Sequence, residues 1–467
     1  MKGPFFSAHD GYPNFSCEIS KPIWKYKHIF FIGIGGISMS ALAEMCIGFG
    51  CLVSGSDLHE NQQTKKLKKI GVKILLKHDS NNISNDIDLV VYTGAVKSDN
   101  PELIEAKKRN IIIFERSQFL GEICKYYKNV IAISGTHGKT TTTAILGEIF
   151  NVAGKKPTIH LGGVAEFGNL QIGEKEYFIT EACEYLNSFS FINSTTALIT
   201  NIDADHLDYY KTKENLKIAF ENFARNSIQN IVLFEDVGLS SDSLEGKTVY
   251  TCGLKEGYDC YAFNIKELEQ GYQFEVNYKK KYLGVFEIKI FGFHNIKNAL
   301  CAITVAYIHG VEVDKIKEGL KKFNGVERRY EKIGKIGKTY VVADYAHHPT
   351  EITASLEGYK NKKVLTIFQP HTYSRTKILL DHFIDCFVCD TVAIFKTYPA
   401  REKHDHEGDE IALYNAIKNR EKYCLNTEEQ LRIFLKNNAK YYDIALILGA
   451  GDIYDIVKKM LVEKQLL

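Results

Sequence analysis

From Lys27 onward, short apolar runs bounded by turn residues alternate with longer stretches of helical periodicity. The first of these runs are HIFFIGIGG, CLVSGSD, LVVYTGAV and IIIFERS, and ISMSALAEMCIGFG is one of the stretches between them. Short β-rich runs separated by helices are typical of a parallel sheet, because each return to a parallel strand needs a crossover helix. The pattern therefore predicts an α/β domain at the start of the chain.

Two further series of the same kind follow. VIAISG, YFITEA, TALITNI and NIVLF form the second series from Asn129, and YVVADYA, VLTIFQP, TVAIFK and IALILGAG form the third from about Tyr340. Between residues 248 and 291 the pattern changes to alternation, as in GYQFEVNY, which favours a small antiparallel patch. We therefore predict three α/β domains, at residues 1–128, 129–326 and 327–467.

Composition narrows the class of protein. The chain has 467 residues, 45% hydrophobic and 25% charged, which suits two or three globular domains. Its formal net charge is +2, from 59 basic and 57 acidic residues, so nucleic acid and acidic membrane surfaces are not expected partners. Eleven scattered cysteines indicate reduced thiols, and the leader MKGPFFSAHDGYPNFSC lacks the apolar run of a signal peptide. We predict a cytoplasmic protein, a monomer or a homodimer.

The second series opens with a glycine-rich loop that resembles a phosphate-binding loop. Gly135 and Gly138 allow the backbone to curl so that successive N–H groups point inward, and a helix begins near Thr140. Lys139 supplies a positive charge, and the Thr140 hydroxyl can bind Mg²⁺. The alternative is a glycine-rich turn with a solvated lysine. The predicted ATP-binding loop comprises Gly135, Thr136, His137, Gly138, Lys139, Thr140 and Thr141.

Reactive residues also follow the next apolar runs. Ligands collect at the carboxyl ends of parallel strands, and Glu181 and His206 lie just after two of the runs. With Thr140 they predict a metal site, although a carboxylate at a strand end is also a common helix cap or ion-pair partner. His206 taken alone is equally compatible with a structural role.

Two pairs of residues lie between the second and third series. Asn295 and Asn298 are three positions apart at a helix start and so share a face, although N-capping would also explain Asn295. Arg328 and Arg329 could be a solvated pair on a linker, or one of them could bind a phosphate through its two guanidinium N–H groups.

The third series places a further polar cluster at its strand ends. Asp344, His347 and His348 follow one apolar run, and His371 and Arg375 follow the next. Each residue has a structural explanation by itself. Together they predict a site for a small zwitterion, with Arg375 for its carboxylate.

The first glycine loop resembles a dinucleotide-binding fingerprint, with a serine where the third glycine is expected. Its backbone N–H groups can bind a diphosphate of any kind, and an acidic residue ends the next strand. A nicotinamide cofactor, and hence an oxidoreductase, is one interpretation, and another diphosphate ligand is the other. The residues concerned are Gly33, Gly35, Gly36, Ser38 and Asp57.

Taken together, these segments resemble the Mur ligases, which use ATP to build peptidoglycan precursors. Nine motifs carry the resemblance in order from about residue 27: GIGGISMSALAE, SGTHGKTTTT, EACEY, TNIDADHLDYY, GFHNIKNA, GVERRYE, DYAHHPTEI, FQPHTYSRT and LGAGDI. The resemblance implies a Rossmann-like N-terminal domain, a central P-loop ATPase domain and a Rossmann-like C-terminal domain. Within the family, the motifs favour the branch that joins L-alanine to the carboxylate of UDP-N-acetylmuramate through an acyl phosphate. The branch that joins a recycled tripeptide to the same sugar is the alternative.

The resemblance also implies roles for single residues. Lys139 would contact the phosphates of ATP, Arg329 the terminal phosphates, and Thr140, Glu181 and His206 a Mg²⁺ ion. Asn295 would reach the adenine with the support of Asn298, and Asp344 would bind the ribose. His348, His371 and Arg375 would bind the alanine, and the first glycine loop the UDP-sugar. A binding protein that holds nucleotide without chemistry is a further alternative from another class.

Overall fold

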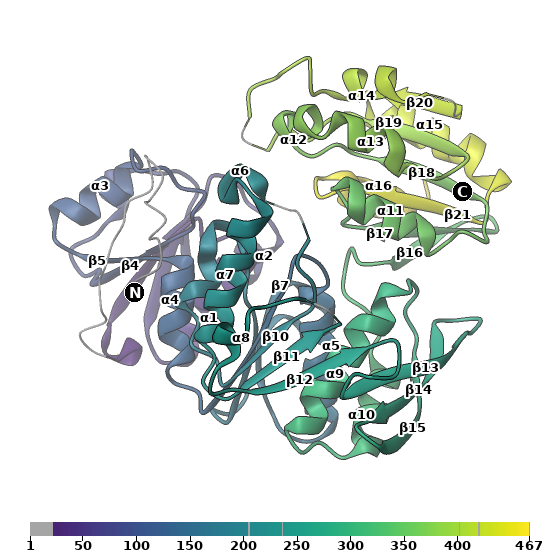
Figure 1. Cartoon of the computed structure of the whole chain (residues 1–467). Coiled ribbons are helices and arrows are strands. Elements are labelled where there is room, and N and C mark those ends of the chain that lie inside the picture. Colours follow the sequence, from purple (N-terminus) through teal and green to yellow (C-terminus); the bar gives the residue numbers. More distant parts are fainter. Residues whose placement is uncertain (1–21, 204–205, 236, 401, 419–420, 467) are drawn as a thin grey trace. The chain divides into compact units, whose positions relative to one another are not determined.

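The structure is a computed structural model that describes residues 22–203, 206–235, 237–400, 402–418 and 421–466 (Figure 1). The leader MKGPFFSAHDGYPNFSC lies outside these residues. The described chain forms two compact units. The first contains the residues up to 264 together with 274–286 and 297–322, and the second contains 265–273, 287–296 and the residues from 323 onward.

The first sheet of the first unit has five parallel strands in the order β3-β2-β1-β4-β5. Alternate residues of β1 belong to two separate cores: Ile29 and Phe31 to one, Phe30 and Ile32 to the other. Both faces of the sheet are therefore covered, as in other parallel sheets. Its elements are β1 (His28–Ile32), α1 (Ile37–Gly48), β2 (Leu52–Ser56), α2 (Gln62–Lys69), β3 (Lys73–Leu75), β4 (Leu89–Tyr92), α3 (Pro101–Lys108), β5 (Ile112–Glu115) and α4 (Arg116–Cys124).

The second sheet has ten strands in the order β15-β14-β13-β12-β11-β10-β6-β9-β7-β8. Strands β9, β6 and β10 are parallel neighbours, so the residues that follow them meet at one edge of the sheet. The strands are β6 (Asn129–Ser134), β7 (Thr158–Ala165), β8 (Gly168–Gln171), β9 (Tyr177–Glu181), β10 (Thr196–Ile199), β11 (Asn230–Phe234), β12 (Thr248–Gly253), β13 (Cys260–Glu267), β14 (Tyr272–Tyr278) and β15 (Lys281–Ile288). The helices are α5 (Lys139–Val152), α6 (Leu207–Tyr210), α7 (Lys213–Arg225), α8 (Ser241–Leu244), α9 (His294–Ile308) and α10 (Val313–Lys322).

The segment with alternating hydrophobicity forms β13, β14 and β15. These strands continue the ten-stranded sheet beyond β12. The alternation reports one buried and one exposed face, and it carries no information on which strand the segment pairs with.

The third sheet lies in the second unit and has the order β16-β17-β21-β18-β19-β20, drawn in green to yellow in Figure 1. Strand β16 is antiparallel to β17, and the other pairs are parallel. The carboxyl ends of β17, β21 and β18 are adjacent, and both faces of the sheet are covered. The elements are β16 (Glu331–Ile336), β17 (Thr339–Asp344), α11 (Pro349–Glu357), β18 (Val364–Phe368), α12 (Tyr373–Ile378), α13 (Leu380–Cys386), β19 (Thr391–Phe395), α14 (Glu410–Ala416), β20 (Glu421–Leu425), α15 (Glu428–Asn438), β21 (Ile444–Leu448) and α16 (Ile453–Val462).

The α/β prediction with three sheets is confirmed. The predicted domain boundaries at 128 and 326 stay predictions. Within the described part of the chain, every helix is too short or too polar to cross a lipid bilayer.

Candidate active site

The loop between β6 and α5 has the backbone that a phosphate-binding loop requires. Gly135 and Gly138 have φ angles of 134° and 85°, in the region that favours glycine. A side chain at Gly135 would collide with Thr200, and one at Gly138 with Asn298. Both positions therefore need glycine, for backbone conformation and for space, and Gly138 forms the N-cap of α5.

The segment after β10 holds this loop in place. The backbone N–H of His137 donates to Asn201 Oδ1 at 2.9 Å, and Asn201 Nδ2 donates back to the His137 carbonyl at 2.9 Å. Thr200 Oγ1 donates to the same carbonyl at 2.7 Å, and the Asp203 N–H donates to Thr136 Oγ1 at 2.9 Å. The conformation of the loop is thus set by neighbouring strands as well as by its own glycines.

Lys139 makes a buried ion pair with Glu184. Its ammonium lies 2.8 Å from Glu184 Oε2 and also donates to the carbonyls of Gly135 at 2.6 Å and Thr136 at 3.0 Å. Burial alone would lower the pKa of Lys139, but the nearby carboxylates, Glu184 above all, more than offset it and hold the pKa above its usual value. Burial likewise acts to raise the pKa of Glu184, and Lys139 and His206 bring it below the usual value.

His206 approaches the same carboxylate. Its Nε2 lies 3.6 Å from Glu184 Oε1, and its ring packs on Tyr185 with centroids 4.7 Å apart. The residue has a φ of 55°, an uncommon conformation for a residue other than glycine, and such conformations cluster at functional sites. Glu184 therefore connects the predicted phosphate lysine to the predicted metal histidine.

Thr140 and Glu181 supply oxygen donors side by side. Thr140 Oγ1 donates to Glu181 Oε2 at 3.0 Å, and Glu181 Oε1 accepts the Gly162 N–H at 2.6 Å. One carboxylate oxygen is thus fixed by the backbone while the other faces Thr140. A hydroxyl and a carboxylate suit Mg²⁺, which prefers oxygen ligands, better than an imidazole does.

Three further predicted ATP contacts, Thr141, Asn295 and Asn298, lie on two helices. Thr141 is buried in the first turn of α5. Asn298 lies in α9, with its carboxamide against Gly138. Asn295 lies in the first turn of the same helix, where its backbone N–H donates to the Gly292 carbonyl and its Nδ2 to the Phe291 carbonyl at 2.6 Å. Asn295 therefore lies inside α9 and not at its N-cap position, and its side-chain amide donates to the segment that precedes the helix.

The first glycine loop is closed by Asp57. Asp57 Oδ2 accepts the Gly35 N–H at 2.8 Å, and its Oδ1 accepts the Leu58 N–H at 2.8 Å. Gly33 has a φ of 80°, and Gly36 is the N-cap of α1. The structure thus brings the predicted UDP-sugar residues together, with Asp57 bonded to the backbone that shapes the loop.

Ser38 connects this loop to the second sheet. Its hydroxyl lies 2.9 Å from His160 Nε2, and His160 Nδ1 lies 2.9 Å from Thr180 Oγ1. Burial lowers the pKa of His160 to about 3, so the ring is neutral at pH 7. Ser38 therefore has a structural partner in addition to its predicted ligand role.

In the second unit, the two neighbouring arginines have different surroundings. Arg328 donates to Asp455 Oδ2 at 2.7 Å and to the Gly451 carbonyl at 3.2 Å. The guanidinium of Arg329 lies over the Tyr345 ring, 5.0 Å from its centroid. Arg328 therefore fastens the chain to the start of α16, whereas Arg329 lies beside the strand end that carries Asp344.

Asp344 is buried at the end of β17. Its Oδ2 accepts from Ser355 Oγ at 3.0 Å, and its Oδ1 accepts the Ala346 N–H at 3.1 Å. Burial raises the pKa of Asp344 to about 6, although Arg329 acts in the opposite direction. Desolvation outweighs the nearby positive charge here.

His347, His371 and Arg375 form a cluster. The rings of His347 and His371 have centroids 5.7 Å apart, and Arg375 Nη1 lies 3.2 Å from His371 Nδ1. A guanidinium only donates, so His371 Nδ1 accepts and its proton is on Nε2. His347 Nδ1 lies 2.9 Å from the Tyr345 carbonyl, which only accepts, so His347 Nδ1 carries the proton. Burial lowers the pKa of both rings, to about 4 for His371.

His348 lies at the start of the helix α11, and its predicted contact with alanine stays a prediction. It is the N-cap of α11, where its Nδ1 accepts the Thr350 N–H at 3.4 Å and its own N–H donates to Glu351 Oε2 at 3.3 Å. The imidazole that packs against His371 is that of His347. The structure thus brings His371 and Arg375 together and gives His348 a role at the helix start.

Comparison with known proteins decides the family. Sequence profiles of three Mur ligase regions match in order: the Mur ligase family catalytic domain at residues 28–128, the middle domain at 133–306 and the glutamate ligase domain at 328–451. The chain belongs to the Mur ligase family. The predicted resemblance is confirmed.

Individual relatives agree with this result. The chain is 41% identical over 450 residues to a UDP-N-acetylmuramate–L-alanine ligase of Alkaliphilus metalliredigens, covering 94% of this chain and 98% of the relative. It is 42% identical over 445 residues to the enzyme of the same name from Clostridium botulinum, covering 92% and 97%. Among solved structures, the UDP-N-acetylmuramate-alanine ligase of Thermotoga maritima matches with a TM-score of 0.79 at 30% identity, over 94% of this chain and 99% of that one. A murein peptide ligase of Psychrobacter arcticus matches with a TM-score of 0.69 at 25% identity, over 94% and 98%.

From the sequence, Glu184 was given no role in the site of this Mur ligase, and the two adjacent histidines of the predicted zwitterion cluster were not told apart. Glu184 stands in the EACEY motif three positions after Glu181, but nothing in the motif shows that it pairs with Lys139. His347 and His348 are neighbours in the chain, and only the start of α11 determines which ring faces His371. These residues stand inside recognisable motifs, but only their contacts in the folded chain indicate what each one does.

Proposed function

We propose that this Mur ligase joins L-alanine to the carboxylate of UDP-N-acetylmuramate with hydrolysis of ATP to ADP and phosphate. Relatives that bear this activity in their names are 41–42% identical over nearly their full length. The observation that carries the chemistry is the phosphate loop, in which Lys139 is paired with buried Glu184 beside Thr140 and Glu181.

A carboxylate does not condense with an amine in water, so the acid needs activation. The muramoyl carboxylate attacks the terminal phosphorus of ATP, the bond to ADP breaks, and an acyl phosphate forms. The amine of alanine then attacks the acyl carbon, phosphate leaves, and the amine loses its proton. The first step needs positive charge around the transferred phosphoryl group, and Lys139 and Arg329 provide it in this proposal.

The three N–H bonds of Lys139 are directed at Gly135, Thr136 and Glu184. To donate to a phosphate oxygen, the ammonium must exchange at least one of these partners. The raised pKa of Lys139 means that it stays charged throughout this exchange. Glu184 thus keeps the lysine ionised and in place before ATP binds.

We further propose that Thr140 and Glu181 bind Mg²⁺ directly, and that His206 and Glu184 support the site without contacting the ion. Bound there, the ion would neutralise negative charge on the phosphates. The oxygen donors fit this ion, since Thr140 Oγ1 and Glu181 Oε2 are 3.0 Å apart and one Glu181 oxygen is fixed by the Gly162 N–H. A direct His206 ligand is less suited to Mg²⁺, and its approach to Glu184 favours an indirect role.

The histidine cluster of the second unit suits the two charges of an amino acid. Arg375 and the protonated Nε2 of His371 both donate, which suits a carboxylate. His347 Nε2 is an acceptor and its ring is neutral at pH 7, which suits an ammonium group. We therefore add His347 to the proposed alanine site and assign His348 to support of α11.

The first glycine loop is the proposed site of the UDP-sugar, because its backbone N–H groups lie at a strand end and at the start of α1. ATP and nucleotide sugars are metabolites of the cytoplasm, and we propose that location. A monomer or a homodimer remains the prediction for the oligomeric state.

The test is the mass of the product formed from UDP-N-acetylmuramate, ATP, Mg²⁺ and L-alanine. We expect the sugar nucleotide to gain one alanine residue, with ADP formed in equal amount. Replacing alanine by the recycled tripeptide tests the alternative ligase, and a nicotinamide cofactor added in place of ATP tests the oxidoreductase. Product formed with the tripeptide and not with alanine would reject the proposal.

A further inference from the structure

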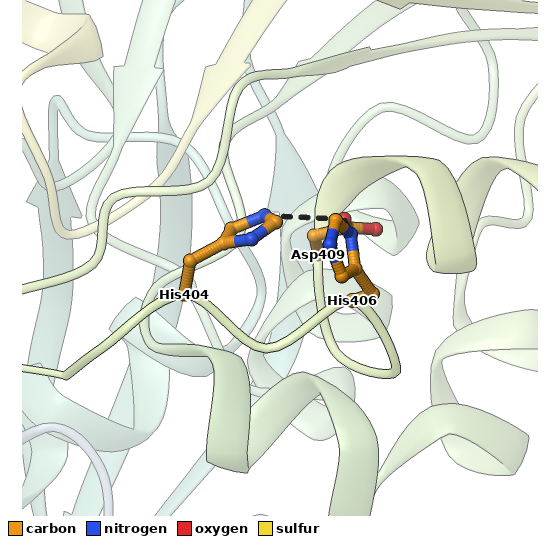
Figure 2. A group of neighbouring side chains, drawn as sticks. All are labelled: His404, His406 and Asp409. Atoms are coloured by element: carbon orange, nitrogen blue, oxygen red, sulfur yellow. Dashed lines mark ion pairs between the residues drawn. The ribbon is translucent and has the colours of Figure 1, made fainter.

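A second group of potential metal ligands lies in the second unit, on the loop that precedes α14. Figure 2 shows His404, His406 and Asp409 grouped there. One ligand atom from each residue lies within 4.8 Å of the other two. Asp409 Oδ2 is 3.3 Å from His404 Nε2 and 3.5 Å from His406 Nδ1. None of these residues belongs to the site proposed for ligation.

Asp409 is oriented by the helix that it caps. Its Oδ1 accepts the N–H groups of Ile411 at 3.1 Å and Ala412 at 2.9 Å, and its side chain is only 4% exposed. The other oxygen, Oδ2, is the atom that both histidines approach. A ligating carboxylate held by a second set of hydrogen bonds is a common arrangement at metal sites.

The distances fit one metal ion. A tetrahedral site with bonds of about 2.0–2.1 Å has edges of about 3.3–3.4 Å between ligand atoms. The two edges to Asp409 Oδ2 measure 3.3 and 3.5 Å, and the third, between the histidines, is at most 4.8 Å. A rotation of the His406 ring, which is 87% exposed, would shorten that third edge without moving buried atoms.

The loop itself is held in place. Glu407 N–H donates to Asp405 Oδ1 at 3.0 Å and the Gly408 N–H to the Asp405 carbonyl at 3.2 Å, which makes the turn that brings the ligands together. The ring of His404 packs edge-on against Tyr373 with centroids 5.1 Å apart. Lys377 pairs with Asp405 at 3.2 Å. The cluster is therefore joined to α12, the helix that carries Arg375.

We propose that His404, His406 and Asp409 bind a divalent transition metal of the zinc class, with a fourth position open to water. Two imidazoles and one carboxylate suit Zn²⁺, Co²⁺ or Ni²⁺, whereas Mg²⁺ and Ca²⁺ prefer oxygen ligands. The bound metal would fasten the loop to the start of α14, which Asp409 caps. This site is independent of the proposed ligase reaction.

The experiment is titration of the full chain with CoCl₂, followed by visible absorption and calorimetry. Millimolar MgCl₂ is present throughout, so that the proposed magnesium site is occupied. We expect the parent to bind one Co²⁺ that the His404→Gln/His406→Gln variant does not bind, and ZnCl₂ to displace it. Each single variant should weaken binding by at least about tenfold, the smallest loss seen when even a supporting contact at a metal site is removed.

Two controls make the result specific. Asp409→Asn keeps the N-cap, because asparagine caps helices as well as aspartate, so it should weaken Co²⁺ binding while the thermal unfolding temperature without metal stays unchanged. His382→Gln removes an exposed histidine of α13 outside the cluster and should bind Co²⁺ like the parent. Equal binding by the parent and the double variant would overturn the proposal, and so would an equal loss in His382→Gln.

Discussion

Two pairs of polar groups respond to desolvation in opposite ways: the part-buried Lys139 with the buried Glu184 in the first unit, and the buried Asp344 with the part-buried His371 in the second. Lys139 and Glu184 lie 2.8 Å apart, and their mutual attraction keeps both charged, with the lysine pKa raised and the glutamate pKa lowered. Asp344 and His371 are dominated by desolvation, which brings the pKa of the acid up to about 6 and that of the imidazole down to about 4.

The difference shows that burial does not determine charge by itself. A direct ion pair offsets desolvation, whereas hydrogen bonds to neutral groups and a more distant arginine do not. The proposed phosphoryl-transfer site needs a permanent positive charge, whereas the proposed amino-acid site combines neutral imidazoles with the charged Arg375. The two surroundings suit the two proposed tasks.

The largest expected effect comes from breaking the buried pair. Lys139→Met leaves Glu184 buried without its partner, so the free energy of unfolding should fall by about 3–5 kcal/mol. ATP-dependent turnover should fall by about 100- to 1000-fold or more, since a preorganised charge is lost. Urea unfolding and ADP release measure the two effects.

The matched control is the double variant Lys139→Met/Glu184→Gln, which removes both charges. It should regain most of the lost stability and none of the turnover. If the single variant were as stable as the parent, the ion pair would not be the reason for the raised pKa of Lys139.

Next in size is the contrast between the two arginines. Arg329→Ala should lower turnover by about 100-fold, about 2.7 kcal/mol, because a charge near the transferred phosphoryl group is lost. Arg328→Ala should leave turnover within about twofold and cost at most about 1 kcal/mol of stability, since Asp455 is half-exposed. Steady-state kinetics of both variants measure the two effects. An equal loss of turnover in the two variants would contradict the separate roles of the two arginines.

Asp344→Asn tests the desolvated acid. The pKa of Asp344 rises from 3.8 in the unfolded chain to about 6 in the folded protein, so the folded state binds the proton more tightly. This contribution to stability is present below pH 4 and is lost as the pH rises through 6. The variant stays neutral, so at pH 7.5 it should be more stable than the parent by about 2–3 kcal/mol.

Urea unfolding at pH 4.5 and 7.5 measures this difference, and ATP titration measures the proposed ribose contact separately. We expect the gain in stability to shrink toward pH 4.5 and nucleotide affinity to fall at both values. A gain that grew on acidification would mean that Asp344 is charged in the folded protein.

His371→Gln should change the pH dependence of stability least, and in the direction opposite to Asp344→Asn. The pKa of His371 falls from 6.5 to about 4 on folding, so its contribution to stability is present above pH 6.5 and is lost as the pH falls toward 4. Glutamine does not titrate, so acidification from pH 7 to 4.5 should lower the free energy of unfolding less in the variant than in the parent. Because the ring is partly exposed, we expect a difference of about 1 kcal/mol. Thermal unfolding at both pH values tests this, and an identical pH dependence would contradict it.

Much of the site could be predicted from residues that follow apolar runs. The glycine loop, Lys139 and Thr140 were predicted as a phosphate site, and the structure gives Gly135 and Gly138 the backbone angles that this requires. Glu184 was not predicted as a site residue, because its pairing with Lys139 joins residues 45 positions apart. The alternating segment was predicted to lie in the central domain, but its pairing beside β12 could not be predicted, since periodicity is local and strand pairing is not.

The sequence by itself determined the α/β class, the family and the kinds of reactive group, because periodicity and motif spacing are properties of neighbouring residues. Only the tertiary structure decided that His347, of the two adjacent histidines, packs its ring against His371. It also decided which buried groups keep their charge. The physical reason is that desolvation and Coulomb attraction depend on distances of a few ångströms between segments that are remote in the chain.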